Sequence, residues 1–542
     1  MTRPFRLADA DLAALGAGLP TAGTLGLLRR AQLSRHLLLL REVRRELSET
    51  PFWYATLTAT GTTSTEAESR IADPMTGLWA AQALTALRAG DKPDELPAPS
   101  GHHLRVTHAG MTLAVRLDDS GPLRHRLGLP PAAPLTPDEL AHWHTCLAAA
   151  WTLLTTRHRA AATTLAEVLR VIVPVQPDPS AEGISATSAE AFGAVAISTP
   201  ADGRSLAVGL LHETQHSVLN AVHSLFELTH PTATRGYSPW REDPRPPLGV
   251  LHGVYAYLAV TRFWRTEAAA HRDDNATAHP DSDAAARQDS DAAARQDSDA
   301  AARQDSDATA HPGNLVAAHQ GGEGTTAEFE FARWRVAVAE AARELLDGGR
   351  LTPVGARFAG ALLAEVTAWR DEPVAPETKR LASIARADHR LRWRLRNLLV
   401  DPDDTAALAA AWRDHRKPPE VRVRVVPATG RALENSSRLR LIRAWLTNPS
   451  TADHPAVDHP AAEGPAQEDT ATAGDAACLR GDHESAGISY RRRLLSDPSD
   501  DAAWSGLALV SPHPALHTRP EVVRAAALTL PGADPLALAA WL

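Results

Sequence analysis

The chain has 542 residues, enough for about three to four domain-sized units. It carries 56 basic and 65 acidic side chains, and this acidic balance argues against a protein that binds nucleic acid. Two cysteines are too few for a disulfide framework or a thiolate zinc site, and they fit a reducing cytoplasm. Asp9 and Asp11 stand where a signal peptide needs apolar residues, and no apolar stretch reaches membrane-spanning length. We therefore expect a soluble, cytoplasmic protein without a membrane partner.

The N-terminal 164 residues are predicted to be mainly helical. Leucines at mixed three- and four-residue spacing predict a helix over 24–48, and the same pattern recurs at 76–90. Alternating apolar and polar residues predict a small hairpin at 101–117. One long helix is expected over 136–169, and it begins with a Thr-Pro-Asp-Glu start signal.

Two strands and two helices are predicted next. The β-branched run VLRVIVPVQ at 168–176 and the segment AFGAVAIS at 191–198 indicate strands, whereas 205–229 and 248–269 have helical periodicity. The order helix, strand, strand, helix predicts that the helix at 205–229 lies directly beneath a small sheet.

The composition changes abruptly between 271 and 318. The octapeptide DSDAAARQ occurs there in tandem, and its only apolar residue type is Ala. Such a repeat cannot bury a core, so a disordered, solvated insertion is expected.

Helical periodicity returns after the insertion. Helices are predicted over 327–347, 352–370 and 376–398, and a Pro-, Ala- and Asp-rich linker follows at 449–472. The tail has the spacing of a tetratricopeptide helix–turn–helix unit at Ala486, Tyr490, Leu495, Pro498, Trp504, Gly506 and Leu507. One unit is too short for a solenoid, so we expect a docking or packing appendage.

The helix predicted at 205–229 contains the sequence His212-Glu213-Thr214-Gln215-His216. Residues i and i+4 share a helix face one turn apart, so both imidazoles can bind one metal ion. Glu213 directly follows the first ligand and is expected at the flank of the ion. A motif with three fixed positions also arises by chance, but the apolar helix and the adjacent strand favour a metal site.

A third ligand is required, and His252 is the preferred candidate. It lies in an apolar helix, where a buried imidazole needs a partner, and Gly253 beside it would permit a close helix approach. The alternative is a hydrogen-bonded core histidine. Glu227 and Glu242 are the next candidates for the ligand.

Other residues near the motif are weaker candidates for the third metal ligand. The long metzincin pattern needs glycine and histidine where this chain has Leu219 and Val222. His223 lies about 10.5 Å along the helix axis from His216, too far to share an ion without a bend. His230 precedes a proline and is expected to end the helix.

Four prolines stiffen the segment YSPWREDPRPP at 237–247, between the two helices. Arg241 and Arg245 are therefore expected to be held in place for a carboxylate, which guanidinium binds in bidentate fashion. The alternative is that they pair with surface acids such as Glu242 and Asp243.

The segments LLHETQH, YSPWREDPRP and LHGVYAYLAVTRFW resemble the HExxH-motif proteins of ribosomal peptide natural-product clusters. Those proteins occur alone or fused to radical-SAM peptide-modifying enzymes. The resemblance covers about 165–270, continues more weakly at 381–400 and in the tail, and carries over to His212, His216 and His252. It implies iron(II)- and 2-oxoglutarate-dependent β-hydroxylation of residues in a precursor peptide. It also implies two partners, that peptide and a radical-SAM enzyme of the same pathway.

The chemistry of the reaction that the resemblance implies suggests roles for the remaining candidates. Arg241 or Arg245 would bind the far carboxylate of 2-oxoglutarate, and Glu213 would position the substrate. If the metal is zinc, Glu213 would instead activate water for peptide hydrolysis, so a zinc metallopeptidase is the alternative enzyme. A non-catalytic helical scaffold that binds peptide through its tail is a third possibility.

The predicted fold class is mainly α with a small β-sheet, an α+β protein. Six segments are expected: a helical region with a hairpin (1–164), the metal-binding core (165–270), the insertion (271–318), a helical region that completes the catalytic domain (319–448), a linker (449–472) and the tetratricopeptide-like tail (473–542).

Overall fold

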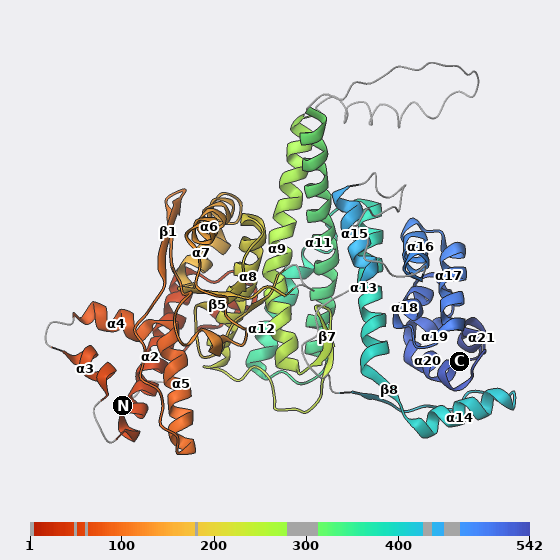
Figure 1. Cartoon of the computed structure of the whole chain (residues 1–542), viewed down its shortest axis with the longest axis horizontal. Coiled ribbons are helices and arrows are strands. Elements are labelled where there is room, and N and C mark those ends of the chain that lie inside the picture. Colours follow the sequence, from red (N-terminus) through yellow and green to blue (C-terminus); the bar gives the residue numbers. More distant parts are fainter. Residues whose placement is uncertain are drawn as a thin grey trace. The chain divides into compact units, whose positions relative to one another are not determined.

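The computed structural model describes residues 5–47, 51–59, 63–178, 183–278, 313–426, 436–448 and 467–542. The chain is mainly helical with small β-sheets, as predicted (Figure 1). It folds into two compact units. The first comprises Met1–Trp240, Arg245–Phe263 and Trp334–Asp371, and the second comprises Arg241–Pro244, Trp264–Arg333 and Glu372–Leu542.

The first unit opens with helices that confirm the predictions at 24–48 and 76–90. They are α1 (Asp9–Gly16), α2 (Ala22–Glu46), α3 (Phe52–Thr58), α4 (Ser64–Ala72) and α5 (Pro74–Ala89). The later helices of this unit are η1 (Arg124–Leu127), α6 (Pro137–Arg157), α7 (Arg159–Val168), α8 (Gly203–His223) and α12 (Pro353–Thr367).

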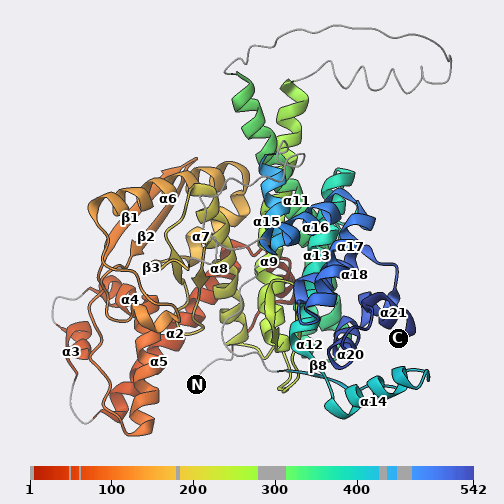
Figure 2. The ribbon, with the colours of Figure 1, turned by 45° about the vertical axis from the view of Figure 1, so that its right-hand side comes forward.

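A five-stranded sheet forms the centre of the first unit (Figure 2). Its strands are β1 (His102–His108), β2 (Met111–Leu117), β3 (Val171–Val175), β4 (Ser185–Ala186) and β5 (Ala194–Ser198), in the order β1-β2-β3-β5-β4. The hairpin and both single strands predicted from the sequence are confirmed. The β2–β3 and β3–β5 pairs are parallel, and the two outer pairs are antiparallel. The two-residue strand β4 was not predicted.

The single helix predicted over 136–169 is wrong, because the chain breaks at His158 into α6 and α7. The backbone of His158 has φ −128° and ψ 45°, which is not helical. Its buried ring stacks on Phe263, with 4.4 Å between ring centroids. This contact is remote in sequence, so the local helical pattern gives no sign of the break.

Helix α8 lies against the sheet, as predicted. It begins at a capping box formed by Asp202 and Ser205. Gly209 faces the sheet so closely that an added Cβ would lie 2.8 Å from Ile197 of β5. The helix ends at His223, six residues before the predicted end, and Thr229 instead forms a β-bridge with Leu351.

Two long helices, α9 (Pro247–Ala278) and α11 (Gly313–Asp347), contribute residues to both units. The ends of the predicted insertion at 271–318 belong to these helices, and 279–312 lie outside the described residues. Much of the predicted linker, 449–466, lies outside them as well. Short strands β6 (Gly236–Ser238) and β7 (Arg241–Arg245) precede α9.

The remaining elements of the second unit are mainly helices. They are α13 (Pro376–Asn397), β8 (Leu398–Val400), α14 (Pro402–Arg413), β9 (Val423–Val425), α15 (Ser437–Thr447), α16 (Gln467–Arg480), α17 (His483–Ser496), α18 (Asp501–Val510), α19 (Pro514–Thr518), α20 (Pro520–Thr529) and α21 (Pro535–Trp541).

An ion-pair network lies in the core of the second unit. Arg438 of α15, whose side chain is 1% exposed, donates to Asp388 of α13 at 2.6 Å and to Asp475 of α16 at 2.6 Å. Tyr490 of α17 donates to Asp475 at 2.7 Å, and Ser505 of α18 contacts Arg438. The network therefore joins five helices around one buried cation.

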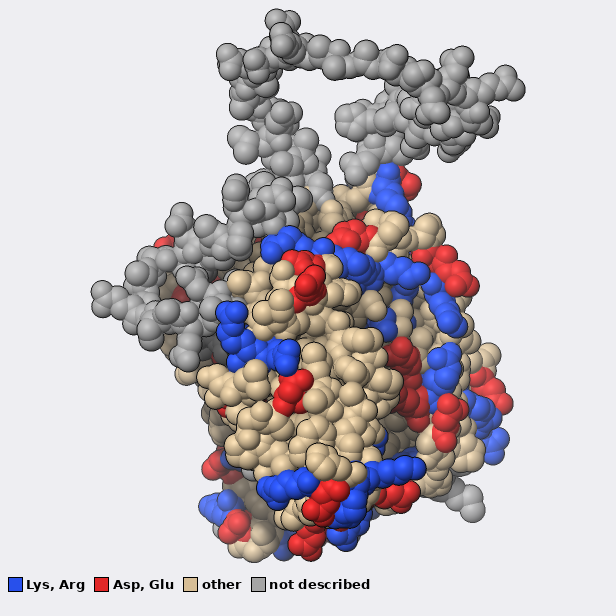
Figure 3. All heavy atoms as spheres, turned by 90° about the vertical axis from the view of Figure 1, so that its right-hand side faces the viewer, with Lys and Arg blue, Asp and Glu red and all other residues tan. Residues whose placement is uncertain are grey.

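The tail forms consecutive packed helices, although its assignment as a tetratricopeptide unit stays a prediction. Gly506 lies against the ring of Tyr490, where a Cβ would come within 2.4 Å of the ring. Leu495, one of the residues with tetratricopeptide spacing, is 48% exposed, and the neighbouring Leu494 is buried. Ile488 and Leu495 line an open groove of about 490 Å³. Figure 3 shows that much of the surface on the side of the C-terminal helices carries no charged residue.

The two cysteines, Cys146 and Cys478, are both buried and unbridged. Burial raises the pKa of the Cys146 thiol and raises that of Cys478 to about 11. Among the described helices, none combines the length and apolar character needed to cross a membrane.

Candidate metal centre

His212 and His216 lie one turn apart on α8, and their rings meet as the i,i+4 spacing predicts. Their Nε2 atoms are 3.1 Å apart, and the rings are nearly perpendicular, with 4.7 Å between centroids. Two coordinating nitrogens on one helix face are therefore close enough to share an ion.

His252 of α9 is brought to the same place, although 36 residues separate it from His216. Its Nδ1 is 3.3 Å from Nδ1 of His216, so the His216 ring faces His212 with one nitrogen and His252 with the other. Because these contacts use opposite nitrogens of one ring, an ion shared by all three imidazoles requires a rotation of the His216 or His252 ring.

Glu213 is also close to the histidine pair. Its carboxylate is 2% exposed, accepts a hydrogen bond from Ser185 of β4 at 2.6 Å, and lies 4.0 Å from Nε2 of His212. Potential ligand atoms of His212, Glu213 and His216 all lie within 4.8 Å of one another. The described residues thus offer two overlapping donor sets, one completed by Glu213 and the other by His252.

All three imidazoles are electrically neutral near pH 7. Burial lowers the pKa of both His212 and His252 to about 4. Burial, together with the neighbouring His212 and His252 rings, holds the pKa of His216 well below its usual value. A metal ion binds the unprotonated nitrogen of imidazole, so protons compete weakly for these atoms.

The side chains of Tyr257, Trp240 and Trp334 form an aromatic wall beside His212. Tyr257 of α9 meets the His212 ring edge-on at 5.3 Å and contacts the rings of Trp240 at 5.1 Å and Trp334 at 4.2 Å. The prediction for Gly253 needs correction, because the group packed on it is the Trp240 indole and not another helix. A Cβ at Gly253 would lie 1.8 Å from the indole nitrogen.

Arg245 is the predicted cofactor-binding residue that lies in the same unit as the histidines. Its positive charge lowers the pKa of both His216 and His252. Arg245 also lines a cavity of about 240 Å³ together with Tyr237 and Val250. The guanidinium is therefore close enough to the candidate centre to act on it electrostatically.

Arg241 belongs to the second unit. Its Nε donates to Asp243 at 2.6 Å, so it pairs with a neighbouring acid, which was the predicted alternative to binding a ligand carboxylate. Glu242, one of the reserve ligands, is held there by Arg392 and by Arg396, the latter at 2.6 Å. A carboxylate already bound by two guanidinium groups is a poor candidate for a metal ligand. Glu227, the other reserve ligand, has an exposed side chain.

Sequence reasoning missed Ser185, Tyr257 and Trp334 as neighbours of the motif. Tyr257 was recognisable as a member of the apolar helix after His252, but Trp334 follows an insertion and Ser185 lies in the short strand β4, which the sequence pattern did not predict. No spacing rule connects those two positions to the histidines.

Comparisons of this chain with protein-family models and with curated proteins give no match. The resemblance to HExxH-motif proteins therefore rests on the quoted motifs, and the function has to be argued from the residues themselves.

Proposed function

We propose that this chain is an iron(II)- and 2-oxoglutarate-dependent hydroxylase that modifies the β-carbon of residues in a ribosomally made precursor peptide. The observation that carries the proposal is the cluster of His212, His216 and His252, which are close together and neutral. A radical-SAM enzyme of the same pathway is the proposed partner, and the cytoplasm is the proposed compartment.

The donor set fits a first-row metal ion. Neutral imidazole suits iron and zinc, and two histidines with one carboxylate on a shared face are typical of non-haem iron oxygenases. His212 and His216 belong to either possible set. We assign His252 as the third ligand and Glu213 as the group that positions the substrate, held by Ser185. The bound iron would supply the oxidising chemistry for hydroxylation.

Arg245 is the residue proposed to bind the far carboxylate of 2-oxoglutarate. It lies in the same unit as the histidines, and its charge acts on two of them. The aromatic wall of Tyr257, Trp240 and Trp334 would limit the access of water to the reacting side chain.

A zinc metallopeptidase is the second candidate, because Glu213 lies close to His212. At 4.0 Å from Nε2 of that ring, the carboxylate is near enough to accept a proton from a water molecule at the ion. The two candidates differ in the consequence of Glu213→Gln, which would remove nearly all turnover in a peptidase.

The decisive experiment uses the full chain, freed of metal and reloaded with iron(II). It is incubated with 2-oxoglutarate, dioxygen and a candidate precursor peptide. Formation of succinate and a peptide mass increase of one oxygen are expected. Arg245→Ala should raise the KM for 2-oxoglutarate, because it removes a charged partner of the carboxylate, whereas Arg241→Ala should leave that KM unchanged.

Metal binding is tested separately from turnover. His212→Ala and His216→Ala should each abolish stoichiometric iron binding, and His144→Ala, at an exposed position of α6, is the control. His252→Ala should weaken binding strongly, whereas Glu213→Gln should retain the ion. If His252→Ala retains the ion and Glu213→Gln loses it, Glu213 is the third ligand in place of His252. Peptide cleavage with zinc under anaerobic conditions and without succinate would refute the hydroxylase.

A further inference from the structure

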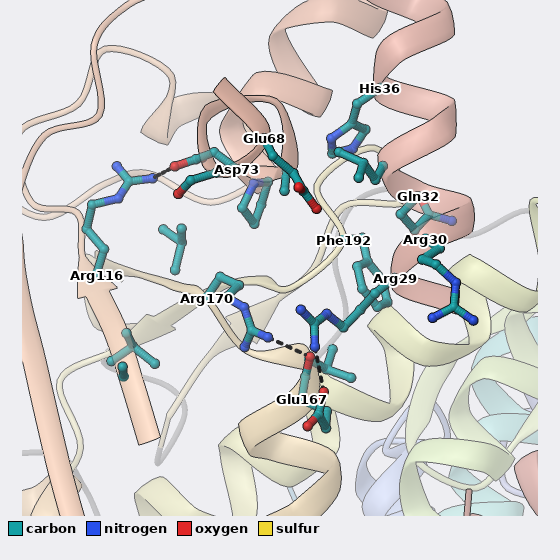
Figure 4. A pocket seen from close by; sticks show the side chains of 18 of the residues that line it. Arg29, Arg30, Gln32, His36, Glu68, Asp73, Arg116, Glu167, Arg170 and Phe192 are labelled. Atoms are coloured by element: carbon teal, nitrogen blue, oxygen red, sulfur yellow. Dashed lines mark hydrogen bonds and ion pairs between the residues drawn. The ribbon is translucent and has the colours of Figure 1, made fainter. Parts of the chain in front are cut away.

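A second candidate site lies in the first unit, in a cleft between the β1–β2 hairpin and helices α2 and α4 (Figure 4). Its volume is about 790 Å³. Pockets for small molecules typically measure about 300–1,000 Å³, so this cleft can hold an organic ligand. None of the residues proposed for the metal centre lines it.

Arginines enter the cleft from several elements. Arg29 and Arg30 come from α2, Arg105 from β1, Arg116 from β2 and Arg170 from the segment that follows α7. The hairpin register pairs Arg105 with Ala114 and His103 with Arg116, so Arg105 and Arg116 project from the same face of the hairpin. Cationic groups therefore line both walls.

The acidic residues of the lining balance only part of this charge. Arg29 pairs with Glu167 at 2.6 Å, and Arg116 pairs with Asp73 at 2.7 Å. Glu68 is the third carboxylate, so five arginines face three acids. The lining has a surplus of two positive charges.

Two exposed arginines of the lining, Arg30 and Arg105, lie outside these ion pairs. Within the described ranges, Arg30 and Arg105 make no ion pair with any carboxylate. They come from opposite walls, α2 and β1, and both line the cleft. Their guanidinium groups are free to bind an anionic group of a ligand.

Arg29, Arg170 and Glu167 interact with one another at the base of the cleft. Arg170 donates to the backbone carbonyl of Glu167 at 2.9 Å, and Arg29 binds the carboxylate of that residue (Figure 4). Burial and the nearby positive charge of Arg29 lower the pKa of Arg170, and the Glu167 carboxylate partly offsets this shift.

We propose that the cleft binds a small organic polyanion, a molecule that carries a phosphate group or at least two carboxylates. The guanidinium groups of Arg30 and Arg105 bind the anionic groups from opposite walls. Leu33 and Phe192, which also line the cleft, contact the apolar part of the ligand.

The test is titration calorimetry of the full chain with two probes, tripolyphosphate and citrate, at constant ionic strength. Saturable binding of at least one probe, with one site per chain, is expected. The double variant Arg30→Gln/Arg105→Gln should bind that probe roughly tenfold more weakly or worse, because it loses two charge-assisted contacts. Arg41→Gln is the matched control, since Arg41 is exposed on the same helix and does not line the cleft.

Circular dichroism and iron binding should be the same in the parent and in both variants, which separates loss of the ligand from loss of the fold. Binding of tripolyphosphate alone assigns a phosphate ligand, and binding of citrate alone assigns a polycarboxylate. An absence of saturable binding to the folded parent overturns the proposal. Equal affinity in the parent and the double variant overturns it as well.

Discussion

The histidine cluster of the first unit and the Arg438 network of the second are both built from buried polar groups, and they have opposite electrostatics. In the second unit, Arg438 is surrounded by carboxylates. Burial opposes its charge, but Asp388 and Asp475 hold its pKa well above the usual value. In the first unit, burial of His212, His216 and His252 is not offset in this way, and their pKa values fall. A cluster that supplies its own counter-charges maintains structure, whereas a cluster of neutral donors can accept an external cation.

The largest expected effect comes from removing the cation of the second unit. Arg438→Met leaves Asp388 and Asp475 buried without their partner, which should lower the free energy of unfolding by about 3–5 kcal/mol. Urea unfolding followed by circular dichroism measures this loss. Arg440→Met, at an exposed position on the same helix, should change it by less than about 0.5 kcal/mol. Equal losses in the two variants would show that the network contributes little.

The aromatic wall beside His212 should leave no room for a methyl group at Gly253. Gly253→Ala places a methyl group within 1.8 Å of Trp240, so the indole must move, at a cost of about 1–3 kcal/mol. Thermal unfolding and the iron affinity measure the consequence. Gly360→Ala, on α12 with nothing near the added Cβ, should be neutral or stabilising. Restoration of stability by adding Trp240→Leu to Gly253→Ala would identify the indole as the clashing group.

The clusters should also respond to acid in different pH ranges in the metal-free protein. The folded-state pKa of His212 is about 4, below the unfolded value of about 6.5, so the unfolded chain binds more protons as the pH falls below 6.5. Stability should therefore decrease from pH 6.5 towards 4, by about 2–3 kcal/mol for this residue. His212→Gln should reduce that slope, and His144→Gln, at an exposed position of α6, should not.

The ion-pair network should lose its contribution only under more acidic conditions. Burial would raise the pKa of Asp388, but Arg438 and Arg392 outweigh it and hold the pKa below its usual value. The stabilisation is thus complete above the unfolded pKa of about 3.9 and disappears as the pH falls through the lower folded value. Asp388→Asn should change the pH profile only below about 4. A change between pH 5 and 7 would contradict this assignment.

The smallest effect on stability is expected from replacing one imidazole of the histidine cluster, that of His252. His252→Leu removes no charge near neutral pH and keeps an apolar side chain of similar size, so the metal-free protein should lose at most about 1–2 kcal/mol. Iron binding should decrease far more than stability does. Calorimetric titration with iron(II) and urea unfolding of the same sample give both values. A stability loss as large as that of Arg438→Met would make His252 a core residue.

Much of the site-bearing region follows from local patterns. The β1–β2 hairpin, the strands β3 and β5 and the start of α8 are encoded by alternation, β-branched residues and a capping signal. The proximity of His212 and His216 follows from helix geometry alone. The resemblance and the apolar setting pointed to His252, and the structure places its ring beside His216.

Other features depend on contacts between distant residues. The break at His158 depends on Phe263, and the aromatic wall depends on Trp334, which lies 94 positions after Trp240. The partners of Arg438 come from helices on both sides of α15, and nothing in its local sequence identifies them. Arg241 and Arg245 looked equivalent in the sequence, yet the fold assigns them to different units.

The burial of both cysteines has a practical consequence for measuring this molecule. Thiolates are the form that reacts with maleimides, and Cys146 and Cys478 are shielded and protonated. The natural chain is therefore suited to site-specific labelling without prior removal of its thiols. A cysteine introduced at an exposed position such as Arg41 would react in preference to them. A spin label there could report distances to a paramagnetic ion at the histidines.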